Sequence, residues 1–248
     1  MTELTALQIA QAVAAAFLVG FTKTGMPGLG IVIVPMLASV FGGKPAMGVL
    51  LPMLFFGDFF AIAYHRRNAQ WPILAKLLPW VLGGMALGYL ALERVTSEQL
   101  TTLLAGLVLT LVALKAAQKV GGGWLEEHLP RRWWFSATAG MLAGFATTVG
   151  NVAGAITGIY FLSMGLKKHG FMGTGAWFYC IVNASKIPLY LSLGLITAQT
   201  VTFDVKVAPV IAVGAVIGFL AFKQIPQRWF DRAILILATF AALRLLFF

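Results

Sequence analysis

The 248 residues are 60% hydrophobic and only 10% charged, whereas soluble domains average about 45–50% and about 25%. No soluble core of this size could bury so many apolar side chains behind so few charges, so the composition excludes a soluble protein and predicts a polytopic membrane protein. Lysine and arginine outnumber the acids by 18 to 8, a net charge of +10, but they stand singly or in pairs between apolar runs, which argues against nucleic-acid binding.

Eight apolar runs approach the roughly 20 residues that a spanning helix needs. They are Leu4–Phe21, Pro45–Tyr64, Ile73–Leu92, Leu100–Ala117, Trp133–Thr148, Gly170–Leu195, Phe203–Phe222 and Trp229–Phe248. Two shorter runs, Ile31–Phe41 and Ala155–Gly165, each follow a glycine-rich break, and the polar stretch Gln118–Arg132 divides the chain. The sequence therefore predicts an all-α fold with a first repeat over 1–118, a linker over 119–132 and a second repeat over 133–248.

The two halves match when one is shifted by 124 residues, which pairs Gly20 with Gly144 and Thr24 with Thr148. If each long run and the short run after it form a hairpin, each half crosses an odd number of times and the second half is inverted. Twelve lysines and arginines then gather on one side against four on the other, as the positive-inside rule expects, whereas parallel repeats give nine against seven. We therefore expect inverted repeats, each a glycine-broken hairpin plus three spanning helices, with both termini outside.

The first break, Gly20–Gly30, holds four glycines and a proline, which should not continue a helix. The short helix after it should aim its free N–H groups and positive dipole end at the break, where Lys23 adds a full charge. The pattern predicts an anion site formed by Thr22, Lys23, Thr24, Gly25 and Gly28. The alternative is a packing seam of small residues from which Lys23 reaches the membrane surface.

The second break, Gly144–Gly154, has the same character with a milder charge, because Thr147 stands where Lys23 would. Thr148 adds a hydroxyl, and Asn151 is placed to cap the short helix that follows. Inverted halves would bring both breaks together near the midplane, so an anion there would meet two helix N-termini.

Asn183 and Lys186 lie inside the apolar run Gly170–Leu195, and a lysine in a membrane helix marks a functional-site candidate. The two are three residues apart and share one helix face, while Pro188 frees a carbonyl nearby. Thr174 lies three turns before Lys186, too far to share a single contact, and is kept as a candidate. The alternative for Lys186 is a structural ion pair with Asp58.

Asp58 is the only acidic residue that we assign to the interior of an apolar run, at an offset of 125 from Asn183. It either couples transport to protons or holds Lys23 or Lys186 in place. His65, followed by Arg66 and Arg67, is interpreted as a cytoplasmic anchor, with an entry ring for anions as the alternative.

Catalytic and metal-binding patterns are missing from the sequence. Cys180 is the only cysteine, which excludes a disulfide framework, and the three histidines lack metal-ligand spacing. We find no His/Asp/Glu cluster and no nucleophile–base pair, so we expect neither an enzyme nor a metal site.

In these residues the sequence resembles the sulfite exporter TauE/SafE family over nearly its whole length. The resemblance is carried by Gly20, Lys23, Gly25, Pro27, Gly28, Gly30, Pro35, Leu51, Pro52, Asp58, Tyr64, Arg66, Arg67, Trp71, Thr174, Asn183, Lys186 and Pro188. The second break departs from the glycine-dense form of many members, with Thr147–Asn151 instead. The resemblance implies a bacterial inner-membrane carrier for small sulfur-containing or organic anions, often exported, with no prosthetic group.

The leading hypothesis is a secondary transporter of sulfite, sulfonates or related anions that works by alternating access between the repeats. An anion channel, a carrier of a non-sulfur carboxylate and a scaffold stay open as alternatives. The expected partners are a small anion, the lipid bilayer, a proton or sodium as coupling ion, and a second copy in a homodimer.

Overall fold

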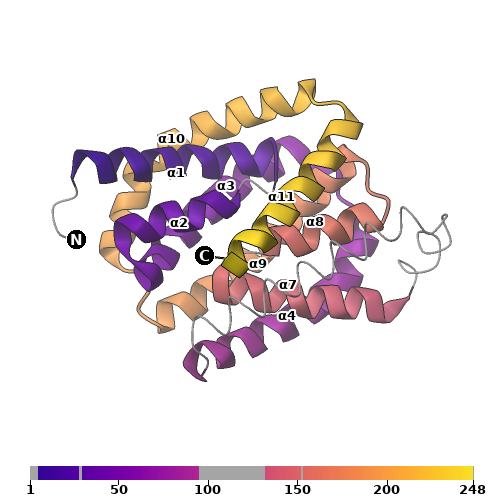
Figure 1. Ribbon diagram of the computed structural model, residues 1–248, viewed down its shortest axis with the longest axis horizontal. Helices are drawn as coiled ribbons and strands as arrows, with labels where there is room; N and C mark the ends of the chain where they lie inside the picture. The colour runs from indigo at the N-terminus through magenta and orange to yellow at the C-terminus, as the bar shows by residue number, and fades with distance from the viewer. Residues whose placement is uncertain (1–4, 28–29, 95–131, 152, 248) are drawn as a thin grey trace. The chain divides into compact units, whose positions relative to one another are not determined.

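The computed structural model describes residues 5–27, 30–94, 132–151 and 153–247, and every regular element among them is a helix (Figure 1). In chain order they are α1 (Ala6–Thr24), α2 (Gly30–Phe41), α3 (Gly43–His65), the short 3-10 helix η1 (Arg66–Asn68), α4 (Trp71–Arg94), α7 (Trp133–Gly150), α8 (Ala153–Ser163), α9 (Lys168–Ser192), α10 (Ala198–Gln224) and α11 (Gln227–Phe247). The all-α prediction is confirmed for this part of the chain. Gly28, the predicted segment Leu100–Ala117 and the predicted linker before Arg132 lie outside the described residues.

Several helices have the length and composition of membrane spans. Among the described residues the long apolar stretches are Ala6–Thr24, Pro45–Asn68, Trp71–Ala91 and Ala198–Gln224, and the shorter apolar helices are Val32–Phe41 and Ala153–Ser163. Twenty helical residues cover about 30 Å, the thickness of the hydrocarbon core. The chain is therefore a multi-pass membrane protein.

The chain forms two compact units, and each takes residues from both predicted halves. The first unit contains Met1–Ala69 and Met172–Ile225, and the second contains Gln70–Phe171 and Pro226–Phe248. Lys23, Asp58, Asn183 and Lys186 all belong to the first unit, whereas Thr148 and Asn151 belong to the second. The repeat boundaries at 118 and 133 stay a prediction.

The first unit is built on small apolar side chains of α1. This helix begins at a capping box, in which Thr5 and Gln8 bond each other's backbone N–H groups. Its buried face packs against residues of α2, α3 and α10. The shared cluster contains Ala12, Ala15, Ala16, Val19, Ile33, Leu37, Ala46, Val49, Leu50, Met53, Val207 and Ile211. Helices α1 and α2 therefore pack on each other on either side of the first break.

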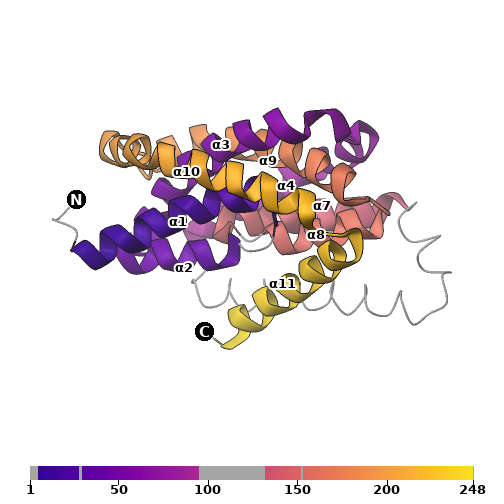
Figure 2. The ribbon, with the colours of Figure 1, turned by 90° about the horizontal axis from the view of Figure 1, so that it is seen from above.

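Glycines bring α1 and α10 into backbone contact, and Figures 1 and 2 show these helices side by side. A Cβ atom on Gly20 would lie 1.9 Å from the Ile211 carbonyl oxygen, and one on Gly214 would lie 2.1 Å from the Phe17 oxygen. Phe21 contacts Gly218 in the same way. Because residues later in α1 contact residues later in α10, the two helices run parallel. In a membrane such small-residue contacts hold helices together by close packing.

The second unit repeats this packing between α4 and α7. A Cβ atom on Gly144 would lie 2.0 Å from the Val81 oxygen, and one on Gly84 would lie 2.1 Å from the Met141 oxygen. Gly144 and Met141 follow Gly20 and Phe17 by 124 residues, while Val81 and Gly84 precede Ile211 and Gly214 by 130. The α7 helix packs in turn on α8, and α8 packs on α11.

Both breaks are narrower than the sequence predicted. Helix α1 continues through Gly20 to Thr24, and α7 continues through Gly144 to Gly150. The prediction that Gly20 starts the break was wrong, because a glycine costs a helix only about 1 kcal/mol. Backbone packing of Gly20 and Gly144 against a neighbouring helix offsets that cost. Thr22 and Lys23 therefore lie in the last turn of α1 and not in a loop.

Candidate functional site

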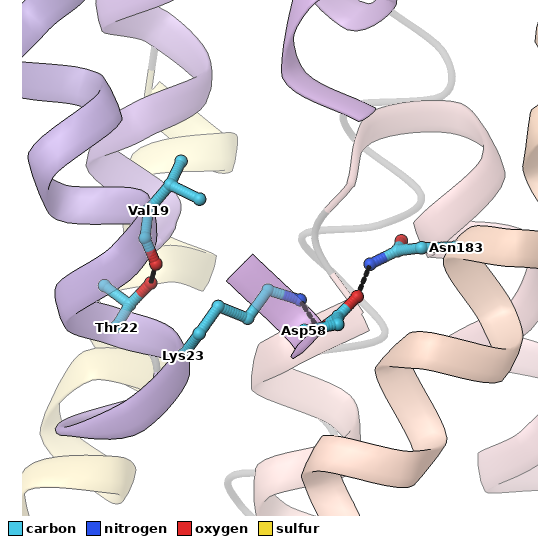
Figure 3. Close-up of polar contacts among 5 residues, drawn as sticks. All are labelled: Val19, Thr22, Lys23, Asp58 and Asn183. Carbon is cyan, nitrogen blue, oxygen red and sulfur yellow. Dashed lines mark hydrogen bonds and ion pairs between the residues drawn. The ribbon is translucent and has the colours of Figure 1, made fainter. Parts of the chain in front are cut away.

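Lys23 and Asp58 form a buried ion pair in the first unit (Figure 3). Lys23 projects from the last turn of α1, where the negative end of the helix dipole favours a cation. Its Nζ atom lies 2.5 Å from Oδ1 of Asp58 on α3. The Asp58 side chain is fully buried and that of Lys23 is 10% exposed. Of the two partners that the sequence left open for Asp58, Lys23 makes the direct ion pair.

Asn183 brings α9 to the same carboxylate. Its Nδ2 atom donates to Oδ2 of Asp58 over 2.7 Å, so each carboxylate oxygen accepts one hydrogen bond (Figure 3). Contacts along the two helices show that α9 runs antiparallel to α3. A Cβ atom on Gly173 would lie 2.7 Å from the His65 oxygen, near the end of α3, and one on Gly48 would lie 1.9 Å from the oxygen of Leu195, just after α9.

Lys186 and Tyr179 flank this pair. Lys186 follows Asn183 by three residues on the same face of α9 and is fully buried, with its charge close enough to interact with those of Asp58 and Lys23. Its Nζ atom lies 5.9 Å from the centroid of the Tyr190 ring. The Tyr179 ring lies 4.7 Å from the Lys23 ammonium group, a cation–π contact. Tyr179 was not singled out from the sequence.

We call the side chains of Lys23, Asp58, Asn183 and Lys186 the polar cluster. When ionised they carry two ammonium charges against one carboxylate, and three of them are at most 2% exposed. An excess charge in a low-dielectric interior is costly unless a counter-charge offsets it. The cluster is therefore suited to bind one small anion.

The threonines of the first break have their hydroxyl groups engaged elsewhere. Thr22 donates to the Val19 carbonyl over 3.0 Å (Figure 3), and Thr24 donates to the Ala215 carbonyl over 2.6 Å. A threonine hydroxyl has one hydrogen, so neither is offered to an anion in this conformation. Gly25 serves packing, since its Cβ position is 2.6 Å from the Gly218 oxygen.

The remaining candidates, Thr174 and Thr148, are separated from the polar cluster along the sequence. Thr174 is buried on α9, three turns before Lys186. Thr148, in the second unit, donates its hydroxyl to the Gly144 carbonyl over 3.0 Å. That the two breaks meet around an anion stays a prediction.

Asn151 ends α7, and its role as the cap of α8 stays a prediction. Its backbone is left-handed, with φ 55° and ψ 25°, and its N–H group bonds the Thr147 carbonyl over 3.2 Å. Asparagine tolerates this conformation better than most residues, which favours it at the end of a helix.

His65 is buried, at 1% exposure, and was wrongly grouped with the exposed Arg66 and Arg67 as an anchor. Its Nε2 atom lies 2.9 Å from the Thr24 carbonyl oxygen, and since a carbonyl only accepts, Nε2 carries the hydrogen. His65 thereby satisfies a terminal carbonyl of α1. Its seven-residue spacing from Asp58, two helical turns, was the signal that could have placed it on the buried face.

Asp204 is a second acidic residue inside a membrane helix. It lies in α10 at 8% exposure, and neither carboxylate oxygen has a hydrogen-bond partner among the described residues. The statement that Asp58 is the only such acid was therefore wrong. Asp204 stands second in the apolar run Phe203–Phe222, an edge position that suggested a helix end.

The chain was compared with protein families, curated proteins and solved structures. The family model described as Sulfite exporter TauE/SafE matches residues 12–245. No curated protein and no solved structure matches the chain significantly.

Proposed function

Because the chain belongs to the sulfite exporter TauE/SafE family, we propose that it exports sulfite or a related small oxyanion across a bacterial inner membrane. The family implies a membrane transporter of sulfite or related anions. One observation on this chain itself supports the proposal: the polar cluster holds two lysine side chains and one aspartate in a buried setting. A carrier needs this kind of site, selective for charge and closed to bulk water.

The chemistry of the cluster suits an oxyanion with several acceptor atoms. Ammonium groups donate up to three hydrogen bonds each, and Asn183 has a second amide hydrogen besides the one given to Asp58. Sulfite and sulfonates offer three oxygens on one sulfur atom, so a single anion could accept from Lys186, Lys23 and Asn183 together. A carboxylate offers two oxygens and would leave a donor unused, which favours the sulfur oxyanions.

Two features support inverted repeats as the basis of alternating access. Asp58 and Asn183, 125 residues apart, occupy nearly equivalent places in the two predicted halves, and they contact each other across antiparallel helices. A residue that contacts its own equivalent lies on a two-fold axis, and equivalent helices that run antiparallel are what inversion requires. The glycine contacts of α1 with α10 also recur between α7 and α4. We place the substrate site on this axis, with both termini outside as the charge distribution favours.

Counterflow in proteoliposomes tests the proposed function. Vesicles loaded with unlabelled sulfite are expected to take up labelled sulfite transiently above its equilibrium level, with saturation, because a carrier exchanges one bound anion for another. Methanesulfonate should compete better than acetate. Uptake that equilibrates without overshoot or saturation would identify a channel, and competition by acetate alone would identify a carboxylate carrier; either result contradicts the proposal.

A further inference from the structure

Asp204 is buried in α10 in a way that ordinary helix packing does not explain. Its side chain is 8% exposed and neither oxygen has a hydrogen-bond partner among the described residues. The hydroxyl group of Thr200, one turn earlier on the same helix, donates to the Thr197 carbonyl as part of the helix cap. Buried polar groups are almost always hydrogen-bonded, so an exception of this kind requires an explanation.

The second unit shows that packing does not require a carboxylate at this position. Gly84 and Gly88 of α4 contact α7 as Gly214 and Gly218 of α10 contact α1, which aligns the two helices at an offset of 130. This alignment also pairs Lys76 with Lys206 and Pro79 with Pro209, and it places Leu74 opposite Asp204. Leu74 is 0% exposed. The equivalent site is thus filled by a leucine, and the acid is a departure particular to α10.

The charged groups that the structure describes on the helices packed against Asp204 are distant from it or exposed. Helix α10 packs on α1 and α3, and Phe203 contacts Phe41 of α2. Phe17 of α1 lies beside Gly214 of the parallel helix α10. Lys23 comes six residues after Phe17 and Asp204 comes ten residues before Gly214. At 1.5 Å per residue, Lys23 and Asp204 are therefore about 24 Å apart along the helix axes.

The other charges on these elements can be named one by one. Asp58, which contacts Lys23, and His65, two turns further along α3, lie toward the same end as Lys23. On α10 itself Lys206 and Lys223 are exposed, and α2 carries no charged residue. The side chain of Lys44, at the start of α3, lies outside the described residues.

A single buried carboxylate suits a proton better than a metal cation. Sodium and other hard cations need several converging oxygen ligands, whereas no group of three or more His, Cys, Asp or Glu gathers among the described residues. A proton needs one carboxylate oxygen. An isolated carboxylate away from water is costly as the anion and far less so as the neutral acid.

We propose that Asp204 is the proton-binding site of transport, protonated while α10 is closed as it is here and deprotonated when a conformational change admits water. One proton then moves with each anion, bound as Asp204–COOH and released as H⁺ with the carboxylate restored. This inference rests on the proposed function, because coupling requires an anion carrier. It assigns the coupling ion and the residue that carries it.

The test measures protons moved per sulfite in proteoliposomes, with a pH dye inside the vesicles and equal pH on both sides. Asp204→Asn mimics the neutral acid, so it is expected to keep sulfite counterflow and to move one proton fewer per sulfite than the wild type. Protons carried by sulfite itself are the same for both proteins, so only the difference counts. The matched control is Asp231→Asn on α11, whose carboxylate accepts from Gln227 over 2.7 Å and whose loss should leave the ratio unchanged.

The outcomes separate this inference from the proposed function. An unchanged proton ratio in Asp204→Asn, a loss of counterflow in that folded variant, or a sodium gradient that drives wild-type sulfite uptake would overturn the assignment. If Asp204→Asn does not fold, Asp204→Leu, which copies Leu74, takes its place with the same expectations. Absence of saturable counterflow in the wild type would instead refute the proposed function.

Discussion

Lys23→Met is expected to destabilise the protein and abolish saturable anion flux, whereas Lys23→Met combined with Asp58→Asn should restore stability but not flux. The single change leaves the fully buried Asp58 carboxylate without its ion-pair partner, and breaking a buried pair on one side costs about 3–5 kcal/mol. The double change leaves a neutral amide beside Asn183 and removes that cost. Thermal unfolding in detergent measures the first effect and sulfite counterflow the second.

The double variant decides between two roles for this ion pair. If Lys23 and Asp58 only hold α1 against α3, the double variant transports sulfite as the wild type does, and Lys23 is not part of the binding site. If Lys23 contacts the anion, flux stays lost although the protein is as stable as before. Lys223→Met, at an exposed position in the last turn of α10, is the matched control and should change neither measurement.

Lys186→Met is expected to keep the fold and weaken anion binding at least tenfold, which corresponds to about 1.4 kcal/mol. Lys186 is fully buried beside a carboxylate that already accepts from Lys23 and Asn183, so its removal brings the polar cluster to charge balance. In this variant the Asp58 carboxylate keeps Lys23 and Asn183 as partners, so the folded state is not left with an unpaired carboxylate. The anion, however, loses a cation in a low-dielectric site, where attraction is strong.

The measurement is the sulfite concentration that half-saturates counterflow. Lys186→Arg keeps the charge with a different shape, so it should bind more tightly than Lys186→Met while falling short of the wild type. An unchanged half-saturating concentration in a folded Lys186→Met protein would exclude Lys186 from the site.

The sequence predicted the corresponding places of Asp58 and Asn183 in the two halves, but neither their contact nor which lysine pairs with Asp58. Their offset of 125, one more than that of the repeats, places the two residues at nearly equivalent points, and the structure joins them over 2.7 Å. Whether Asp58 pairs with Lys23 or Lys186 depends on how closely α1 approaches α3. That approach is set by tertiary packing of small side chains, which no local pattern encodes.

The predicted extent of the two breaks was wrong for a related reason. Glycine content predicts where a helix is weak, but a helix ends only where its backbone groups find better partners elsewhere. At Gly20 the lost helix propensity is offset by contact with the α10 backbone, so α1 continues to Thr24. Asp204 and His65 stood at the edges of apolar runs, where sequence reasoning assigns polar residues to the membrane surface.

The most direct test of the account is to locate the bound anion. Selenite has the shape and charge of sulfite and carries an anomalous scatterer, so a crystal structure of the protein with selenite shows where it binds. We expect a selenium peak within hydrogen-bonding reach of the Lys186 ammonium group, between α3 and α9. A protein whose sulfite counterflow is inhibited by selenite, but whose selenium peak lies elsewhere, would contradict the assignment of the polar cluster as the transport site.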